Sequence, residues 1–211
     1  MVSLCGRLVL VASLLTVGSA GAGLAQAQES AEALSAQSLQ ECDSGRRAKE
    51  RHVRLAHFEN SQSLAEQAVA LNDQLADAHF ALFCSLGEQL RIDGETMTSV
   101  FGVRRVMKEL DRTLELNPDH MDALSSKGTF LVRLPALFGG DEQKGEHMLR
   151  RVIEREPKAI NARLTLAKTY AGRGNRDHAI TLAKEALDLA QAEGRMDLIP
   201  EAKATFLELQ P

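Results

Sequence analysis

Apolar residues recur at helical spacing along most of the chain. Leu64, Ala65, Ala68 and Leu71, for example, fall on one face of a helix. Val and Ile are scattered, and no alternating run of apolar and polar residues is flanked by turn residues, as a strand would require. The pattern therefore predicts an all-α protein.

Several of the predicted helices end in a similar way, which indicates an internal repeat. Residues 69–73, 114–118 and 153–157 share one register, and 187–191 form a weaker fourth copy. Each closes an apolar-periodic helix and precedes a second amphipathic segment. Repeats of roughly 34–45 residues built from two helices stack into a solenoid. We predict a solenoid of about four helix pairs, with a C-terminal helix ending at Leu209 as its cap.

Local signals place some boundaries inside this solenoid. Residues 33–43 are expected to form the first helix of the mature chain, and the Ser44–Gly45 dipeptide is a plausible break. The loop after the fifth helix is apolar, so we expect Leu137 and Phe138 to pack against the solenoid. Asp141 is a good N-cap for the helix that follows.

The N-terminus has the pattern of a secretory signal peptide. Arg7 precedes an apolar run of about ten residues, 8–17, and small residues follow. Such a run is too short to span a hydrocarbon core of ~30 Å, which disfavours a membrane anchor. We predict cleavage after Ala27, or alternatively after Ala25, and export, most simply to the periplasm of a Gram-negative bacterium. The predicted division is 1–27 signal peptide, 28–44 N-terminal segment and first helix, and 45–211 helical repeats.

Two cysteines, Cys42 and Cys84, remain after the predicted cleavage. An even number of cysteines in an oxidising compartment permits one disulfide. The alternative is two separate buried thiols, because the sequence does not bring the two residues within bonding distance. A bond would close a loop of roughly 43 residues and pin the first helix across one end of the repeat groove.

Composition and motifs argue against several classes of function. The net charge is −4, and nucleic-acid binding would need a basic stripe. His52 and His57 are five residues apart, which misses the spacing that places two ligands on one helical face. No Ser lies in a Gly-x-Ser-x-Gly elbow. We expect no catalytic residues, no metal, no cofactor, no nucleic-acid partner and no membrane span after signal cleavage.

The last two repeats resemble the tetratricopeptide repeat family. That family places large, Gly or Ala, Tyr and Pro residues at fixed offsets, and Gln191 occupies the last expected Pro position. The matching residues of the last repeat are Arg163, Leu166, Ala167, Tyr170, Ala179, Ala183 and Ala186. Those of the preceding repeat are Leu124, Gly128, Leu131, Gly145, Leu149, Val152 and Pro157. The resemblance implies a helical solenoid that binds partner proteins on its interior surface.

A more specific likeness lies in the loop Leu134–Asp141, Leu-Pro-Ala-Leu-Phe-Gly-Gly-Asp. It resembles exported bacterial repeat proteins related to the repeat component of tripartite ATP-independent periplasmic (TRAP) transporters. The extended helix pair around Gly94 is similar to that group and to eukaryotic regulators of microtubule dynamics. This resemblance implies a protein partner and, in addition, a hydrophobic small-molecule ligand.

The repeat register predicts which first-helix residues face the concave groove. Arg133 and Lys168 are suited to hold a peptide carboxylate, although the groove lacks the full Lys/Asn clamp of chaperone-binding repeats. Cys84 and Thr165 fall on the same faces. The candidate binding residues are Phe80, Ser125, Ser126, Thr129, Arg133, Asn161, Leu164 and Lys168.

Two functional hypotheses follow from these observations. The first is an exported scaffold that binds a protein partner through the groove, because repeats are present and catalytic constellations are absent. The alternative is a periplasmic carrier of a small hydrophobic ligand that serves a TRAP-type transporter. Enzymatic activity has no support in the sequence.

Overall fold

The structure is a computed structural model that describes residues 18–93 and 99–210, and within these ranges all regular structure is helical. The prediction of an all-α solenoid is confirmed. The elements are α1 (Gly18–Arg47), α2 (Arg51–Leu71), α3 (Ala76–Asp93), α4 (Ser99–Leu116), α5 (Met121–Arg133), the 3₁₀ helix η1 (Ala136–Phe138), α6 (Glu142–Arg155), α7 (Ile160–Gly172), α8 (Arg176–Ala192) and α9 (Ile199–Leu209).

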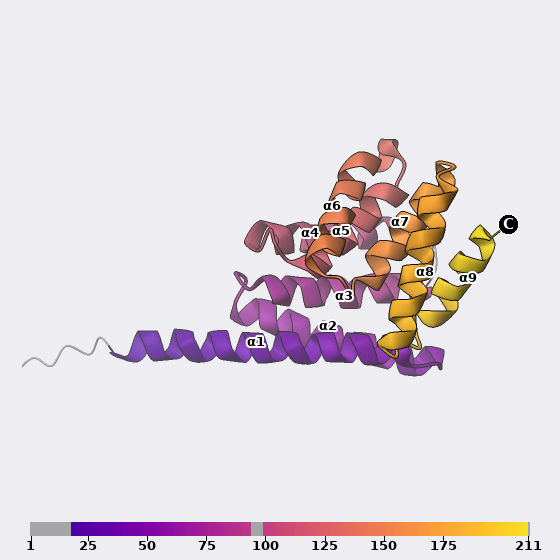
Figure 1. The fold of residues 1–211 in the computed structure, drawn as a ribbon. Coiled ribbons are helices and arrows are strands. Elements are labelled where there is room, and N and C mark those ends of the chain that lie inside the picture. The colour runs from indigo at the N-terminus through magenta and orange to yellow at the C-terminus, as the bar shows by residue number, and fades with distance from the viewer. Residues whose placement is uncertain (1–17, 94–98, 211) are drawn as a thin grey trace, which may run out of the picture.

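Successive helices pair as α1–α2, α3–α4, α5–α6 and α7–α8, and α9 packs against the last pair (Figure 1). The first helices run across the view, whereas α7 and α8 are steeply inclined to them, so the stack twists along its length. Among the odd-numbered helices, α7 contacts both α5 and α9, and residues of α3, α5, α7 and α9 line the concave side.

The cores lie between the pairs, because one pair cannot bury both of its apolar faces. Leu124 and Leu149 of the third pair join Leu166 and Tyr170 of α7 in one buried cluster. A second cluster joins α3 and α4 to the start of α5. Each repeat therefore depends on its neighbour for burial of apolar surface, as expected for a solenoid.

Small residues hold α1 closely against α2. The buried positions of α1 follow one another at spacings of four and three residues, which puts them on a single helical stripe. They are Ala31, Ser35, Ser38, Cys42 and Gly45. The hydroxyl of Ser38 donates to the carbonyl of Ser61 at 2.7 Å, and the hydroxyl of Ser61 donates to the carbonyl of Ser38 at 2.9 Å. Their polar groups are therefore satisfied inside the interface.

The predicted break at Ser44–Gly45 is wrong, because α1 continues to Arg47. Gly45 is buried, and a Cβ atom there would lie 2.5 Å from Cε1 of Phe58. The glycine is therefore required for close approach of α2 and not for a turn. The chain turns after Arg47 instead, at residues 48–50.

The beginning of α1 also differs from the prediction. The helix begins at Gly18 and not near residue 33, since Ala, Gln and Glu dominate 24–34 and favour helix. The later part of α1 packs against α2, and Gln28 accepts a hydrogen bond from Asn72, which caps the end of α2. The segment before Gln28 extends past α2 (Figure 1). Both expected cleavage sites fall in this segment, and cleavage stays a prediction.

The loop between α5 and α6 is held by its backbone. Leu137 is 88% exposed, so the expectation that it packs against the solenoid is wrong, and the side chain of Phe138 lies outside the described residues. The amide of Gly140 donates to the carbonyl of Pro135, and Gly139 has a φ of 87°. Backbone hydrogen bonds thus replace the expected apolar anchor. Asp141 caps α6 as predicted, accepting from the amide of Lys144 at 3.0 Å.

Cys42 and Cys84 form a disulfide that joins α1 to α3, with a Cα–Cα distance of 6.6 Å. Both residues are buried beside Phe58. Of the two possibilities that the sequence left open, the structure selects the bond. It crosslinks the first helix pair to the second at one end of the concave side.

Reduction of this disulfide should destabilise the protein. The closed loop is 42 residues in sequence separation, and the loop-entropy model gives a loss of up to about 4 kcal/mol, or roughly 10 °C in Tm. Thermal unfolding of the oxidised protein with and without a phosphine reductant measures the effect. The double variant Cys42→Ala/Cys84→Ala is the control, and its Tm should not respond to the reductant. An equal Tm for oxidised and reduced wild type would contradict the prediction.

Candidate functional site

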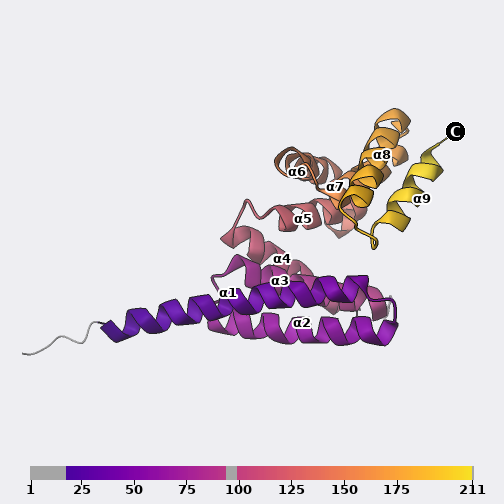
Figure 2. The same ribbon diagram turned by 60° about the horizontal axis from the view of Figure 1, so that its bottom comes forward.

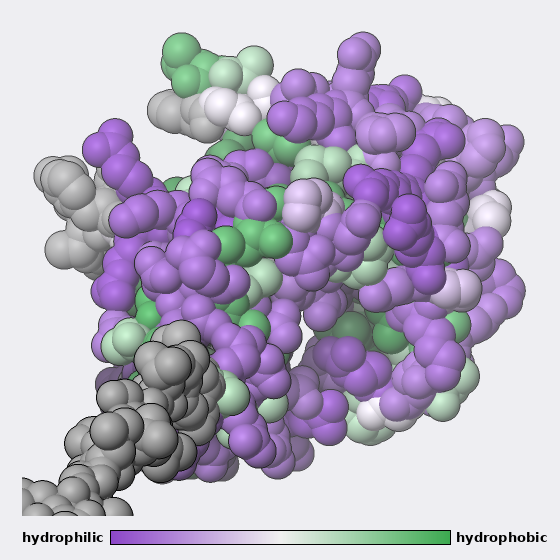
Figure 3. All heavy atoms as spheres, turned by 90° about the vertical axis from the view of Figure 1, so that its left-hand side faces the viewer, coloured by the Kyte–Doolittle hydropathy of each residue, from purple (hydrophilic) through white to green (hydrophobic). Residues whose placement is uncertain are grey.

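The concave side encloses a cavity of about 520 Å³. Its wall combines α3, α5 and α7 with the turn between α1 and α2 and with the start of α9. The space-filling view shows a face that is mostly hydrophilic and hollowed near its centre (Figure 3). A cavity of this size with a polar wall is large enough for a small molecule or a short stretch of peptide.

Most of the predicted groove residues line this cavity. Cys84 and Thr165, which lie on the same helix faces, line it as well. The hydroxyls of Thr129 and Thr165 lie 3.2 Å apart and link α5 to α7 across the cavity floor. The predicted residues in the wall are Ser125, Ser126, Thr129, Arg133, Asn161 and Leu164. Their common location is a property of the fold, and their role in binding stays a prediction.

Phe80 and Lys168 are not in the wall. Phe80 is buried, with its ring centroid 5.6 Å from that of Phe83 and 4.5 Å from that of His120. It therefore belongs to the core between the second and third pairs. Lys168 is exposed and its ammonium lies 2.6 Å from a carboxylate oxygen of Glu201. Glu201, and not Lys168, lines the cavity.

The wall contains four arginines that were not predicted from the sequence. They come from the last turn of α1, from α2, from the last turn of α3 and from the α8–α9 turn, so repeat register alone does not bring them together. They are Arg46, Arg54, Arg91 and Arg195. With Arg133, five arginines face three carboxylates around one cavity. The only signal in the sequence was their position at or near helix ends.

Glu88 pairs with two arginines in the part of the cavity wall that the first helices form. Arg46 reaches it from α1 at 2.7 Å and Arg91 from its own helix at 2.6 Å. Burial acts to raise the pKa of Glu88, but the charge of Arg46 and hydrogen bonds from both arginines outweigh it. The pKa therefore lies below its ordinary value, and the carboxylate stays ionised.

The part of the cavity wall that the last helices form lies close to the part that the first helices form. Figures 1 and 2 show the α8–α9 turn beside the C-terminal end of α1. On that turn Arg195 bonds Asp197 at 2.7 Å and lowers its pKa, and the charge of Arg47 acts in the same direction. Asp43 of α1 in turn raises the pKa of Arg195, although less than Asp197 does. Opposite charges thus face each other where the stack curves back on itself.

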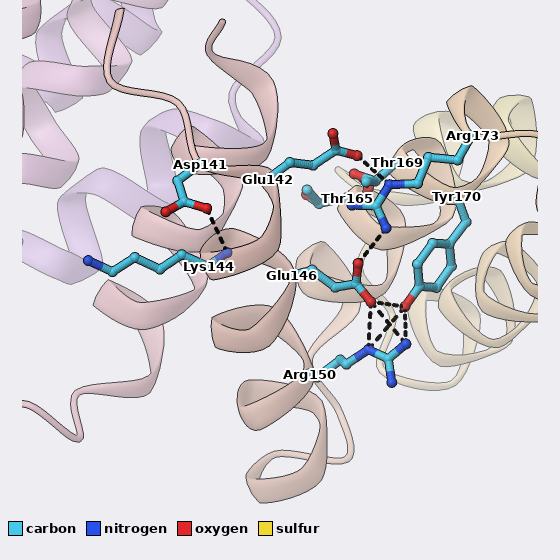
Figure 4. A network of polar contacts seen from close by, with 9 residues as sticks. All are labelled: Asp141, Glu142, Lys144, Glu146, Arg150, Thr165, Thr169, Tyr170 and Arg173. Carbon is cyan, nitrogen blue, oxygen red and sulfur yellow. Dashed lines mark hydrogen bonds and ion pairs between the residues drawn. The ribbon is translucent and has the colours of Figure 1, made fainter. Parts of the chain in front are cut away.

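A polar network sets the angle between α6 and α7 (Figure 4). Tyr170 donates from its hydroxyl to Glu146 at 2.8 Å and accepts from Arg150 at 2.6 Å. Arg173 bridges Glu146 and Glu142. Burial raises the pKa of Tyr170, and the hydrogen bond to Glu146 adds to this, so the phenol stays protonated. Because α7 carries part of the cavity wall, this network helps to position that wall.

A second cavity, of about 690 Å³, lies among α2, α3 and α4. His79 lies in its wall and contacts the carboxylate of Glu109 at 2.7 Å through Nδ1 and the carbonyl of Asp73 at 3.0 Å through Nε2. Both partners are acceptors, so only the doubly protonated imidazole satisfies both. The hydrogen bond to Glu109 raises the pKa of His79 and outweighs burial, which acts to lower it.

Residues 18–93 and 99–210 contain no group of three or more His, Cys, Asp or Glu side chains placed to hold a metal ion. Within the same ranges, no helix is both long enough and apolar enough to cross a membrane. Cys84, which the sequence places five residues after His79, is occupied by the disulfide and so is not a free thiol.

Replacing Tyr170 by Phe should destabilise the protein. The hydroxyl donates to Glu146 and accepts from Arg150, and the loss of hydrogen bonds to charged groups costs about 1.5–3 kcal/mol. Urea unfolding measures the change. In a double-mutant cycle with Glu146→Gln, the two effects should add to more than the effect of the double variant, because the side chains share one network. Strict additivity would show that the contacts do not interact.

The His79–Glu109 pair should make stability depend on pH. Since the folded pKa of His79 is raised, the stabilisation is complete below the unfolded pKa and is lost as the pH rises through the folded pKa. We expect His79→Gln to cost about 2 kcal/mol at pH 5.5 and less at pH 8.5. Urea unfolding at both values tests this, with the exposed His178→Gln as control. A cost that is the same at both pH values contradicts the prediction.

No family model matches the chain, and no curated protein matches it, but solved structures resemble it. A thermophilic TPR protein of Thermus thermophilus is 17% identical, with a TM-score of 0.53 and a match over 84% of this chain and 99% of that chain. PilF of Pseudomonas aeruginosa (14% identity, 90% and 79% covered, TM-score 0.49) and MamA of Desulfovibrio magneticus (17%, 80% and 93%, 0.46) are more distant. The first of these similarities shows that the fold is a tetratricopeptide-type solenoid.

Proposed function

We propose that this protein is an exported scaffold that binds a segment of a partner protein in its concave cavity. The observation that carries the proposal is the convergence of α3, α5 and α7 on one cavity whose wall is rich in hydroxyl, amide and guanidinium groups. A tetratricopeptide-type fold presents such a surface without needing catalytic groups.

The chemistry of the wall suits a peptide. Ser125, Ser126 and Thr129 offer hydroxyls that both donate and accept hydrogen bonds, and exposed Asn161 offers an amide. Peptide backbone has the same two kinds of groups, spaced regularly along an extended segment. The wall adds apolar contacts between the polar ones, from Phe83, Phe130, Leu164 and Leu198. Such a mixture supports recognition of a chain segment.

The same wall gives little support to the alternative function, a carrier of a hydrophobic ligand for a TRAP-type transporter. Charged guanidinium and carboxylate groups on the wall would have to be desolvated against an apolar molecule, which is unfavourable. The exported location rests on the N-terminal sequence pattern, and the partner is therefore to be sought among exported proteins.

Reversing the charge of Arg133 should abolish capture of the partner. Arg133 is exposed and lines the cavity, so a Glu there changes the binding surface without disturbing the core. The assay is crosslinking of tagged protein in the native host followed by mass spectrometry. Lys203→Glu is the matched control, since Lys203 is exposed on α9 outside the cavity wall and the charge change is the same. Equal capture by wild type and Arg133→Glu would remove this end of the cavity from the interaction.

A further inference from the structure

We propose that Arg54 and Arg133 form an anion-binding subsite of the cavity and that it receives the carboxylates of an acidic peptide segment. This inference rests on the proposed function, because it names the chemistry of the partner that the same cavity accepts. It concerns two arginines that line one cavity and whose side chains make no hydrogen bond or ion pair with any other described residue.

The cavity wall carries more positive than negative side chains. Five arginines and three carboxylates line it, in a protein whose net charge is −4. The cavity is therefore locally positive on a molecule that is negative as a whole. Low-dielectric walls concentrate such a field inside a hollow. An acidic segment is consequently attracted to the cavity and repelled by the rest of the surface.

Most of the charged side chains of the wall form ion pairs. Glu88 neutralises part of the charge of Arg46 and Arg91, and Asp197 pairs with Arg195. The remaining carboxylate, Glu201, has its own partner in Lys168, outside the wall. The two arginines left over are Arg54 of α2 and Arg133 of α5. The excess charge is thus assigned to two residues and not spread over the wall.

Arg54 supplies the strongest evidence for a missing ligand. Its Nε atom is buried and has no hydrogen-bond partner within the described ranges. A buried N–H group of a guanidinium without an acceptor is costly, and such groups are rare in folded proteins. Arg54 lines the cavity, so a turn of its side chain toward the cavity would let a bound carboxylate accept from Nε. Guanidinium and carboxylate match each other in planarity and hydrogen-bond geometry.

Arg133 has a different environment, which suits the entry of a ligand. It lies in the last turn of α5, is exposed, and carries no salt bridge within the described ranges. The neighbouring positions Ser126 and Thr129 also line the cavity, so a bound segment that reaches Arg133 passes their hydroxyls. A cavity of about 520 Å³ accommodates several residues, whereas one small inorganic anion would fill little of it. These features favour a peptide over a free anion.

The direct test is binding of a labelled acidic peptide to the purified full-length protein. The probe is an end-blocked hexapeptide, Ser-Asp-Glu-Asp-Glu-Ser, and its neutral counterpart is Ser-Asn-Gln-Asn-Gln-Ser. Fluorescence anisotropy at low and at physiological ionic strength gives the two dissociation constants. We expect the acidic peptide to bind at least about tenfold more tightly than the neutral one and to lose affinity with salt. Equal affinities would overturn the proposal.

Single substitutions locate the subsite. Arg54→Gln and Arg133→Gln should each weaken binding of the acidic peptide by about fivefold or more, whereas Lys203→Gln, which removes the same charge outside the wall, should leave it unchanged. Arg54→Lys, which keeps the charge and loses the planar donors, should recover only part of the affinity. Because Arg133 is exposed, its variant tests the subsite even where Arg54→Gln impairs folding. Unchanged affinity in the Arg133 variant would overturn the proposal.

Two further measurements separate this inference from the proposed function. Inorganic phosphate that displaced the peptide at equal concentration would show a site for free anions and would contradict the peptide assignment. Ser126→Trp fills the cavity and should abolish crosslinking to the native partner. If Ser126→Trp abolishes it and neither glutamine variant weakens it, the cavity binds the partner and the anion subsite is wrong. If Ser126→Trp has no effect, the proposed function itself fails.

Discussion

The structure depends on one constraint: a pair of helices cannot bury its own apolar surface and must be covered by the next pair. Leu149 and Leu166 are both fully buried, yet they belong to successive repeats. The burial of such residues makes stacking cooperative, because removing a repeat exposes the face of its neighbour to water. α9 covers the last pair through Ala202, which packs with Ala186 and Ala190 of α8. Stacking in this way does not require the concave side to be buried.

At the N-terminal end, close packing and covalent chemistry replace part of the large apolar core. α1 and α2 meet through small residues and reciprocal serine hydrogen bonds, and Phe58 fills the space over Gly45. The disulfide then ties α1 to α3. This arrangement fixes the last turns of α1, which carry Arg46, so the crosslink between α1 and α3 also holds one end of the cavity. Stability and the geometry of the candidate site therefore depend on the same residues.

The chemistry of the cavity follows from the curvature of the stack. Side chains on the concave faces of α5 and α7 reach it through the repeat register, which is why Ser126, Thr129 and Asn161 meet there. Among the arginines, Arg195 reaches it because the α8–α9 turn lies beside the C-terminal end of α1 (Figure 2). The carboxylates Glu88 and Asp197 hold three of these arginines in place. The proposed preference for an acidic partner rests on the positive charge that remains at Arg54 and Arg133.

Hydrophobic periodicity and Asp141 were enough to predict the helices, their pairing and the cap of α6, because these features depend on neighbours three or four residues apart. The same periodicity placed Thr129 and Asn161 correctly on the cavity side of α5 and α7, but it wrongly placed Lys168 there. Gly45 was misread as a break, since close packing against a ring and a turn both call for glycine and only the partner helix distinguishes them. The pairing of Cys42 with Cys84, the exposure of Leu137 and the gathering of Arg54 with Arg133 were decided by tertiary structure. The disulfide and the gathering of the arginines depend on packing between helices distant in sequence, whereas Leu137 is exposed because backbone hydrogen bonds hold its loop.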